Sequence, residues 1–289
     1  IRDTDRSRGL GDVYKRQDEL LGQARRISAD PPVRELDALL SCGETGSAAM
    51  TAMQLADMGK SCVSLTGAQA GILTDSVHGA ARILSIDTAR IMRELDAGKI
   101  VVAAGFQGAE RGGDTTTLGR GGSDTTAVEL AAALKADRCE IYSDVDGIYT
   151  ADPRLVTGAV RLDSIDYGDM LHLALHGSQV LHSRSVEAAM RANVRVHLLS
   201  SFTRHEGTVM CKLDDRPGLC GVTRDSSLGT VSIIGREADA HVLAEAVAAL
   251  AHSDIIVTRT ELFDGGCSLF VSPDRLLPAL EITHRRFFR

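Results

Sequence analysis

The sequence predicts an α/β protein with a mostly parallel sheet between helical layers, followed by a smaller α+β domain. Between residues 18 and 212, helical patterns alternate with short apolar runs, which is typical of parallel strands joined through helices. After residue 212 the expected order becomes strand, helix, strand, strand, helix, which is most of a ferredoxin-like domain. The turn-rich segment D-D-R-P-G separates the two patterns, so we place a domain boundary near residue 212, between domains 18–212 and 213–289.

Each expected element rests on a local pattern. The strands of the larger domain coincide with short apolar runs, at residues 61–66, 100–104, 139–143 and 194–199. Its helices coincide with helical periodicity or Ala/Leu-rich segments, at residues 41–59 (opened by S-C-G-E), 89–98, 166–175 and 184–192 and in the second half of 115–133. The run 100–104 is continuously apolar, as expected of a strand covered on both faces. In the smaller domain we expect strands at 230–234, 255–261 and 268–271 and helices at 238–251 and 275–286.

The composition is that of a soluble globular protein. The chain has 289 residues, of which 44% are hydrophobic and 25% charged, and its formal net charge is −7. A general nucleic-acid-binding protein would show a basic surface instead. No stretch approaches the length of a membrane span, and no signal peptide is visible. We therefore expect a cytoplasmic protein without nucleic-acid or membrane partners.

The cysteines and histidines do not predict a metal site. The six cysteines stand singly along the chain, and the nine histidines show no ligand spacing. A chain of this length does not need disulfides to fold. We expect reduced thiols and no bound transition metal.

The first residues do not read as part of a fold. Residues 7–17 (S-R-G-L-G-D-V-Y-K-R-Q) lack apolar periodicity and resemble an in-frame translation of a sequencing-library adapter. We therefore interpret residues 1–17 as a non-native segment and begin the fold at Asp18. On this interpretation the natural N-terminus is missing.

The stretch 115–133 predicts an anion-binding loop. It reads T-T-T-L-G-R-G-G-S-D-T-T-A-V-E-L-A-A-A, so a Gly-rich loop leads into a helix for which Ser123 or Asp124 is a natural N-cap. Unpaired backbone N–H groups and the helix dipole favour an anion there, and Arg120 adds a fork of donors for carboxylate or phosphate. The alternative is a plain Gly-rich turn before a structural helix. The loop has neither the Walker A pattern nor the dinucleotide-binding spacing.

A second polar loop, residues 144–154 (D-V-D-G-I-Y-T-A-D-P-R), follows the expected strand 139–143. Both loops follow apolar strands, and ligands of open α/β sheets bind beyond the carboxyl ends of the strands. A Gly-rich loop with Arg and Asp, together with a loop rich in acids, indicates phosphoryl transfer, which depends on positioning, positive charge and usually Mg²⁺.

Six motifs stand out along the chain: S-C-G-E (41–44), T-G-A-Q-A-G-I-L-T-D-S-V-H-G (66–79), F-Q-G (106–108), T-T-L-G-R-G-G-S-D-T-T-A (116–127), D-V-D-G-I-Y-T-A-D-P-R (144–154) and V-L-H-S-R-S-V-E (180–187). Through these motifs the sequence at residues 35–289 resembles the aspartokinases of the amino-acid kinase superfamily. This resemblance implies a carbamate-kinase-like three-layer sandwich for the larger domain and an ACT-type regulatory domain for the smaller one.

The resemblance implies an acceptor site for L-aspartate. Glu44 is similar to the acid that contacts the amino group, Arg120 to the clamp on the carboxylate, and Asp124 to the catalytic Asp that organises the reacting groups. Phe106 resembles a pocket wall, and the same pocket is lined by Gly121, Gly122 and Ser123. From the residues alone, Glu44 could instead cap a helix, Arg120 could face solvent, Asp124 could be an N-cap and Phe106 a core aromatic.

The resemblance also implies an ATP site on the second loop. Its contacts are expected at Ser143, Asp144, Tyr149 and Arg154, and Gln179 stands where many members have a Lys that contacts the nucleotide phosphates. Asp146 and Asp152 are interpreted as turn formers beside Gly147 and Pro153.

The implied activity is aspartate kinase, a transferase that converts L-aspartate and ATP, carried with Mg²⁺, to 4-phospho-L-aspartate on the way to lysine, threonine and methionine. Alternatives are a superfamily kinase acting on glutamate, acetylglutamate or a nucleotide, and a non-catalytic amino-acid-sensing protein. The chain has no Lys-Phe-Gly-Gly-Thr segment, whose Lys bridges the transferring phosphate in the family, so we expect little activity from this polypeptide. The resemblance further implies an allosteric effector such as lysine or threonine and a homo-oligomer, with dimerisation as the alternative role of the ACT-like domain.

Overall fold

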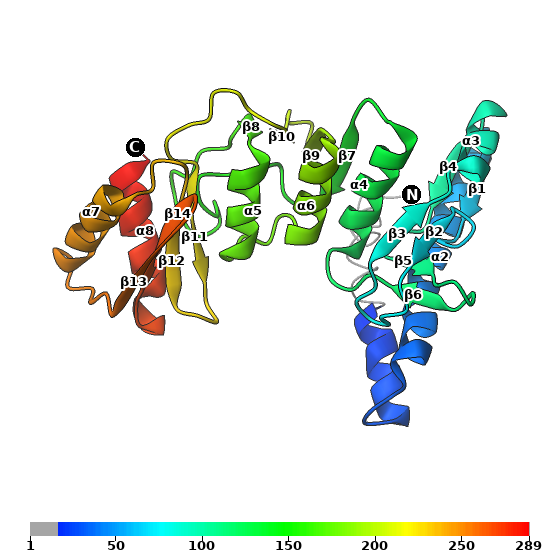
Figure 1. The fold of residues 1–289 in the computed structure, drawn as a ribbon, viewed down its shortest axis with the longest axis horizontal. Helices are drawn as coiled ribbons and strands as arrows, with labels where there is room; N and C mark the ends of the chain where they lie inside the picture. Colours follow the sequence, from blue (N-terminus) through cyan, green and yellow to red (C-terminus); the bar gives the residue numbers. More distant parts are fainter. Residues whose placement is uncertain (1–16, 289) are drawn as a thin grey trace. The chain divides into compact units, whose positions relative to one another are not determined.

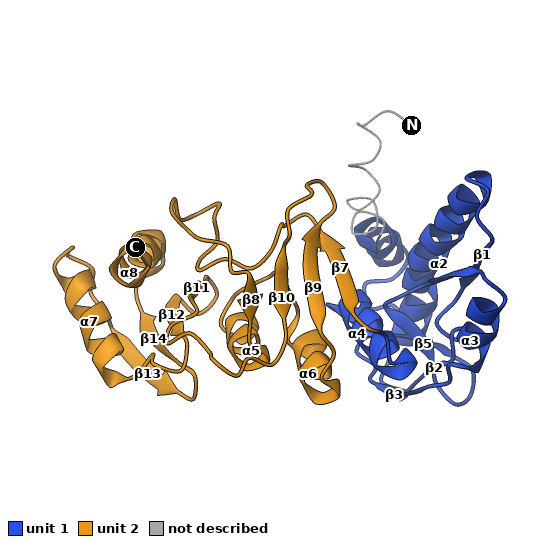
Figure 2. Cartoon of the chain, turned by 90° about the horizontal axis from the view of Figure 1, so that it is seen from above, with its two compact units in different colours: residues 1–136 blue, residues 137–289 orange. Residues whose placement is uncertain are grey.

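The computed structural model describes residues 17–288. The chain forms two compact units, residues 1–136 and residues 137–289 (Figure 2). The predicted domain boundary near residue 212 lies inside the second unit and stays a prediction. Of the segment interpreted as non-native, residues 1–16 lie outside the described residues, while Gln17 is the first residue of a helical segment, 17–27.

In the first unit, the long helix α2 spans Val33–Asp57. The predicted start at residue 41 was wrong: S-C-G-E lies inside the helix, which begins directly after its N-cap Pro32. A proline just before a helix is compatible with its first turn, because the missing N–H would have no partner there. Gly43 and Gly46 lie inside this helix, and packing of α2 against β1 and β6 keeps the segment helical.

The first unit contains two small sheets. Strands β1 (Cys62–Leu65) and β4 (Ile100–Ala103) pair in parallel, where strands were predicted. The prediction that the second of these is covered on both faces was wrong, because Ile100 is 42% exposed and Val101–Ala103 are only partly buried. The other sheet has the order β3-β2-β5-β6 and consists of strands Ile83–Ile86 (β3), Ile72–Thr74 (β2), Gln107–Ala109 (β5) and Thr115–Thr117 (β6).

Two shorter helices accompany these sheets (Figure 1). Helix α3 spans Ala89–Asp96 and is followed by Gly98 in the left-handed region, as predicted from its terminal glycine. Helix α4 spans Gly122–Leu134 and buries Val128 and Ala131. A small core of Leu65, Ala70, Ile72 and Ile91 lies between the sheets and helices.

The second unit begins with a four-stranded sheet of order β7-β9-β10-β8. Its strands are Cys139–Ser143 (β7), Val196–Ser200 (β9), Thr208–Met210 (β10) and Ser164–Ile165 (β8). The first two pair in parallel in full register, as predicted for strands joined through helices. Helices α5 (Tyr167–Leu175) and α6 (Ser183–Ala192) connect them, and Asp166 caps α5 by accepting a hydrogen bond from the Gly168 amide. The mixed α/β class with parallel pairing is confirmed.

The second unit ends in an antiparallel sheet of order β11-β12-β14-β13. Its elements are β11 (Gly221–Asp225), β12 (Thr230–Ile234), α7 (Ala240–Ala251), β13 (Arg259–Phe263), β14 (Gly266–Phe270), a 3-10 turn (Pro273–Arg275) and α8 (Leu276–Phe287). The predicted strand–helix–strand–strand–helix order is present, with β11 added in front. The strand predicted at 255–261 begins only at Arg259, because Ile255 is a buried connector that follows Asp254 in the left-handed region.

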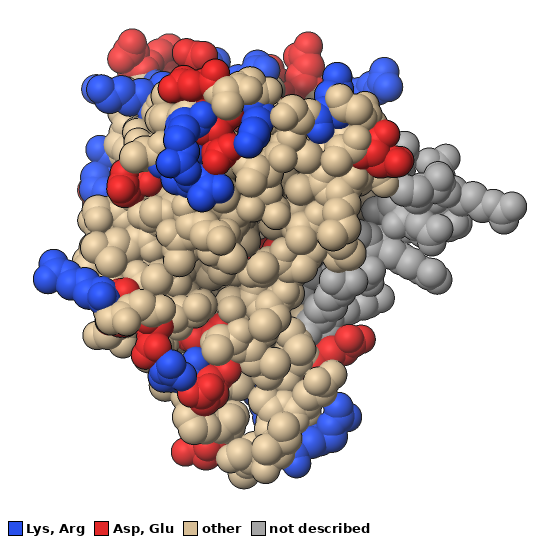
Figure 3. All heavy atoms as spheres, turned by 90° about the vertical axis from the view of Figure 1, so that its right-hand side faces the viewer, with Lys and Arg blue, Asp and Glu red and all other residues tan. Residues whose placement is uncertain are grey.

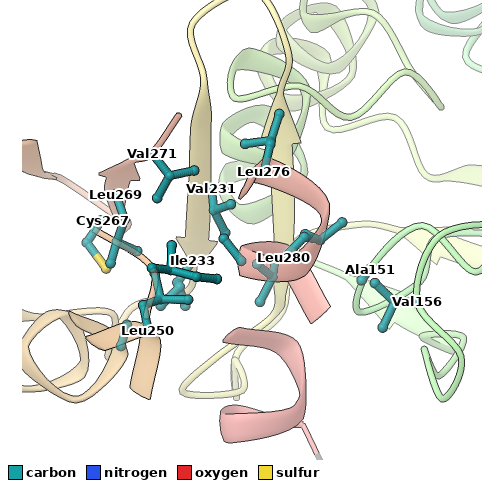
Figure 4. Close-up of a cluster of buried hydrophobic side chains, with 14 of the residues drawn as sticks. Ala151, Val156, Val231, Ile233, Leu250, Cys267, Leu269, Val271, Leu276 and Leu280 are labelled. Carbon is teal, nitrogen blue, oxygen red and sulfur yellow. The ribbon is translucent and has the colours of Figure 1, made fainter. Parts of the chain in front are cut away.

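A hydrophobic core holds the last sheet to its helices. Side chains from β12, β14, α7 and α8 point toward one another (Figure 4). Every residue of β12 is buried, so both faces of this strand are covered. Helices α7 and α8 pack on the sheet, and α5 contacts β11 and β12 (Figure 1). None of the described helices is both long and apolar enough for a membrane crossing.

Candidate functional site

The Gly-rich loop before α4 has a fixed backbone shape. Gly119 (φ 75°) and Gly121 (φ 68°) are both left-handed, and the second is the N-cap of α4. The prediction of Ser123 or Asp124 as N-cap was therefore wrong: both lie in the first turn of the helix. Within this first turn the Gly122 amide donates to the Gly119 carbonyl (3.0 Å). Among residues 17–288 the structure records no hydrogen bond for the amides of Ser123 and Asp124, so these two amides are available to an anion.

Phe106 lies against the start of α4. Its backbone is left-handed (φ 67°), which is unusual for an aromatic residue, and its side chain is 8% exposed. The Phe106 amide donates to Thr126 Oγ1 (3.1 Å), and the Phe106 carbonyl accepts from the Leu118 amide (2.9 Å). A Cβ atom at Gly122 would lie 2.9 Å from Phe106 Cδ2, so only glycine permits this approach. Strain of this kind is retained where the surroundings over-determine it, and it clusters at functional sites.

Arg120 and Ser123 are exposed on this loop, and among residues 17–288 the structure records no side-chain hydrogen bond or ion pair for Arg120. Asp124 is half-buried beside them. Burial raises the pKa of Asp124 from 3.8 to about 6, since a partly desolvated carboxyl disfavours its charged form. The loop thus combines an available guanidinium with a carboxyl that titrates near neutral pH, which is a combination found at functional sites.

Glu44 is half-buried on α2, and the helix-capping interpretation was wrong because the residue is in the middle of that helix. Burial raises the pKa of Glu44, and a hydrogen bond from Gln17 Nε2 (3.2 Å) opposes this. Gln107, next to Phe106, ties α2 to the same region. Its Nε2 donates to the Ser41 carbonyl (3.0 Å) and to Thr45 Oγ1 (3.2 Å). The structure therefore places the S-C-G-E and F-Q-G motifs side by side.

Asp37 is a buried residue that the sequence analysis missed. It is 1% exposed and accepts hydrogen bonds from His78 Nδ1 (2.8 Å), the Gly79 amide (3.0 Å) and Thr117 Oγ1 (2.5 Å). These contacts join α2 to the loop after β2 and to β6. Gly79, which Asp37 holds, packs closely against the Gly-rich loop, since a Cβ at Gly119 would lie 2.8 Å from the Gly79 carbonyl oxygen. The Asp37 cluster therefore also supports the Gly-rich loop. Its only signal in the sequence is a lone Asp in the apolar segment V-R-E-L-D-A-L-L.

The predicted nucleotide contacts of the second loop lie on the second unit, where β7 ends. Ser143 is its last residue, and the Ser143 carbonyl accepts from the Ser201 amide (2.8 Å) of the segment after β9. Ser143 Oγ accepts from the Val145 amide (3.3 Å), which forms a tight turn. Asp144 follows with an exposed side chain. A hydroxyl and an exposed carboxylate thus stand at the carboxyl end of a strand, where α/β sheets bind ligands.

The rest of this loop is ordered by internal pairs. Tyr149 Oη donates to Asp146 Oδ1 (2.9 Å), and His205 Nδ1 lies 2.9 Å from Asp146 Oδ2. The pKa of Asp146 is lowered, and the contact with His205 is the largest cause. Asp152 accepts from the Arg154 amide (2.9 Å) and from its guanidinium (2.8 and 3.0 Å). The Asp152 carboxylate raises the pKa of Arg154, and the guanidinium lowers that of Asp152.

Asp152 is therefore a turn former, as interpreted from the sequence, and it also holds the side chain of Arg154. Asp146 has a wider role than a turn former because it pairs with two side chains. Gln179 is exposed in the connection between α5 and α6. Basic and acidic side chains are interspersed on the face shown in Figure 3, without a continuous basic surface on that side.

The chain is similar to known kinases. The sequence profile of the amino acid kinase family matches residues 5–200. An aspartokinase of Geobacillus stearothermophilus is 47% identical over 246 residues, which cover 84% of this chain and 60% of the relative. The chain thus spans less than two thirds of that relative's length.

Two solved structures of E. coli aspartokinase III have a similar fold. The one in complex with aspartate and ADP (R-state) has a TM-score of 0.63 and 28% identity and covers 91% of this chain and 60% of its own. The one in complex with lysine and aspartate (T-state) has a TM-score of 0.62 and 28% identity, and the match covers 93% and 64% of the two chains.

Proposed function

Because the chain belongs to the amino acid kinase family, we propose that it acts as an aspartate kinase, transferring the γ-phosphate of ATP to the side-chain carboxylate of L-aspartate. The observation that carries this proposal is the loop Gly119–Asp124, which presents an exposed guanidinium beside a half-buried carboxyl with a pKa of about 6. The relative that is 47% identical and named aspartokinase supports the choice of acceptor.

We propose that the first unit binds the amino acid. Arg120, exposed on its loop, offers two parallel N–H donors to a carboxylate. The amides of Ser123 and Asp124 face the same anion from the first turn of α4, where the helix dipole favours negative charge, and Gly121 and Gly122 line the pocket. Glu44 contacts the amino group, and Phe106 forms the apolar wall.

The reaction joins an acceptor carboxylate to phosphorus. A carboxylate oxygen of aspartate forms a bond to the γ-phosphorus while the bond to the β,γ-bridging oxygen breaks, and that oxygen leaves with ADP. Because the attacking group is already an anion, no proton has to be removed from it. The chain's task is therefore to orient the acceptor and to stabilise charge on the transferring oxygens. Asp124 organises the reacting groups and is not itself phosphorylated.

We propose that the second unit binds the nucleotide through the loop Ser143–Arg154. The carboxylate of Asp144 and the hydroxyl of Ser143 are oxygen donors of the kind that Mg²⁺ takes, usually one or two carboxylates together with substrate phosphates. When bound, the ion neutralises charge on the phosphates. Tyr149 and Arg154 contact the nucleotide, and the Asp152 pair keeps the guanidinium of Arg154 in one orientation. Gln179 contributes a neutral contact.

We further propose that the sheet β11–β14 with α7 and α8 is an ACT-like regulatory domain that binds an amino-acid effector such as lysine or threonine, in a homo-oligomer in the cytoplasm. An E. coli relative was solved in complex with lysine, and this supports the class of effector.

Calorimetry on the full chain tests the proposed function. We expect L-aspartate to bind, ADP with Mg²⁺ to bind, and Arg120→Ala to weaken only the binding of L-aspartate. L-glutamate and N-acetyl-L-glutamate are the matched competitors, and hydroxylamine trapping of the acyl phosphate reports turnover. Acyl phosphate formed only from a competitor would assign the chain to another kinase of the superfamily. Amino-acid binding without any nucleotide binding would instead identify a sensor.

A further inference from the structure

Thr150 links the loop Ser143–Arg154 to the C-terminal layer of the second unit. Its hydroxyl accepts a hydrogen bond from the Val160 amide (3.0 Å) and lies 2.8 Å from His284 Nε2 of α8. The Thr150 carbonyl accepts from the Val222 amide of β11 (2.7 Å). One residue of this loop is therefore bonded to a strand and to a helix that lie far from it in the sequence.

The link is fully buried. Thr150 is 5% exposed and His284 is 2% exposed. Burial lowers the pKa of His284, so the ring is neutral and can share one hydrogen bond with the hydroxyl in either tautomer. A Cβ atom at Gly221 would lie 3.0 Å from the Thr150 carbonyl oxygen, so β11 packs closely against this point. Buried polar groups of this kind specify one geometry, since losing either partner leaves the other unsatisfied.

Apolar contacts reinforce the same junction. Ala151 and Val156, which flank Arg154, belong to the core formed by β12, β14, α7 and α8, on the side of Leu280 (Figure 4). The loop is thus held at Thr150 and Ala151, directly between Tyr149 and the Asp152–Arg154 pair. Any shift of α8 or β11 therefore moves the backbone that carries the side chains of Tyr149 and Arg154.

We propose that His284, acting through Thr150, is a positioning residue for the nucleotide loop, so that the packing of α8 sets the affinity for the nucleotide. This inference rests on the proposed function in assigning the loop to the nucleotide. The C-terminal layer contacts the loop directly, through the hydrogen bond between His284 and the Thr150 side chain and the hydrogen bond from the Val222 amide to the Thr150 carbonyl.

The test compares three substitutions at the link with one control. His284→Leu and Thr150→Val remove the side-chain hydrogen bond while filling similar space, and Thr150→Val also removes the acceptor of the Val160 amide. His284→Gln keeps a polar nitrogen and oxygen near the position of Nε2. Thr283→Val is the control, because Thr283 is buried next to His284 and the structure records no partner for its hydroxyl among the described residues.

We expect ADP affinity, measured by calorimetry with Mg²⁺, to fall about five- to tenfold in His284→Leu, as expected for the loss of one buried hydrogen bond. In Thr150→Val it should fall at least as much, because the bond from the Val160 amide is lost as well. His284→Gln should stay within about twofold of the parent chain, and L-aspartate affinity should not change in any variant. Hydrogen–deuterium exchange should become faster in peptides covering residues 144–154 of the two disruptive variants.

Two results would overturn the inference. In the first, His284→Leu lowers only the thermal midpoint, with ADP affinity and exchange over 144–154 unchanged. In the second, Thr283→Val lowers ADP affinity and speeds exchange over 144–154 as much as His284→Leu does, which would assign these effects to general core packing. If the parent chain binds no ADP, the proposed function fails, and hydrogen exchange alone still decides whether His284 positions the loop.

Discussion

The carboxyl of Asp124 should reduce the stability of the fold that holds it. Its pKa is raised from 3.8 to about 6 because the half-buried carboxyl is desolvated. A group whose pKa is higher in the folded state favours folding at low pH, and that contribution is lost as the pH rises through the folded value. At pH 7 Asp124 is charged, so its neutral isostere Asn should stabilise the chain.

The size of this effect follows from the pKa. Raising it from 3.8 to about 6 corresponds to about 3 kcal/mol at pH 7. Partial exposure and the helix N-terminus, which favours the charge, reduce this to about 1–2 kcal/mol for Asp124→Asn. The same substitution should abolish whatever phosphoryl transfer the chain performs, which is the trade-off expected where a destabilising group serves function.

Urea unfolding between pH 4 and pH 8 measures the effect. The chain has no Trp, so far-UV circular dichroism is the suitable signal. The stability gain of Asp124→Asn should be largest at pH 7–8 and shrink as the pH falls below about 6. Asp30→Asn, at an exposed position, is the matched control and should leave stability unchanged. A variant that is less stable than the parent chain at pH 7, or a difference that does not vary with pH, would refute this account of Asp124.

Three further predictions concern other parts of the chain. Arg120→Ala should weaken L-aspartate binding at least about tenfold in calorimetry, without shifting the thermal midpoint, because the exposed guanidinium has no recorded partner among residues 17–288; an equal loss of stability would contradict this. Asp37→Asn should destabilise the first unit by about 2–3 kcal/mol in urea unfolding, because an amide N–H replaces one of the buried carboxylate oxygens that accept hydrogen bonds, including the bond from the Thr117 hydroxyl. Unchanged stability would contradict this. Burial lowers the pKa of His176 and His284, so the folded state resists their protonation, and in the Asp124→Asn background, which removes the opposing titration of Asp124, stability should fall as the pH drops below about 6.5. A urea midpoint of Asp124→Asn that stays flat from pH 8 to pH 5 would be the contrary result.

The sequence predicted those elements whose own residues carry the signal. The apolar runs at β1, β7 and β9 and the glycine after α3 have a local pattern, and each was located from it. By contrast, β5 and β6 are three-residue strands made of Gln, Gly, Ala and Thr, and their pairing with each other defines them. Without the partner strand, neither has a pattern of its own.

The candidate site divides in the same way. Motifs identify Arg120 and Asp124 as a pair, because loop and helix are adjacent in the sequence. They do not reveal that Phe106 is left-handed, or that Asp37 supports the loop from α2. Both facts depend on contacts between segments far apart in the chain. The position of the N-cap was mispredicted for a related reason: the left-handed backbone of Gly121 starts the helix before the polar side chains can cap it.

The contact between Gly122 and Phe106 limits which substitutions the start of α4 can accept. Because it has no Cβ, residue 122 leaves room for the aromatic ring, whose Cδ2 would lie 2.9 Å from an added methyl group. Adding that methyl group would displace the ring and release a backbone that only its surroundings keep left-handed. A library that varies residue 122 alone should therefore return clones in which the Phe106 ring is displaced and the first unit is less stable.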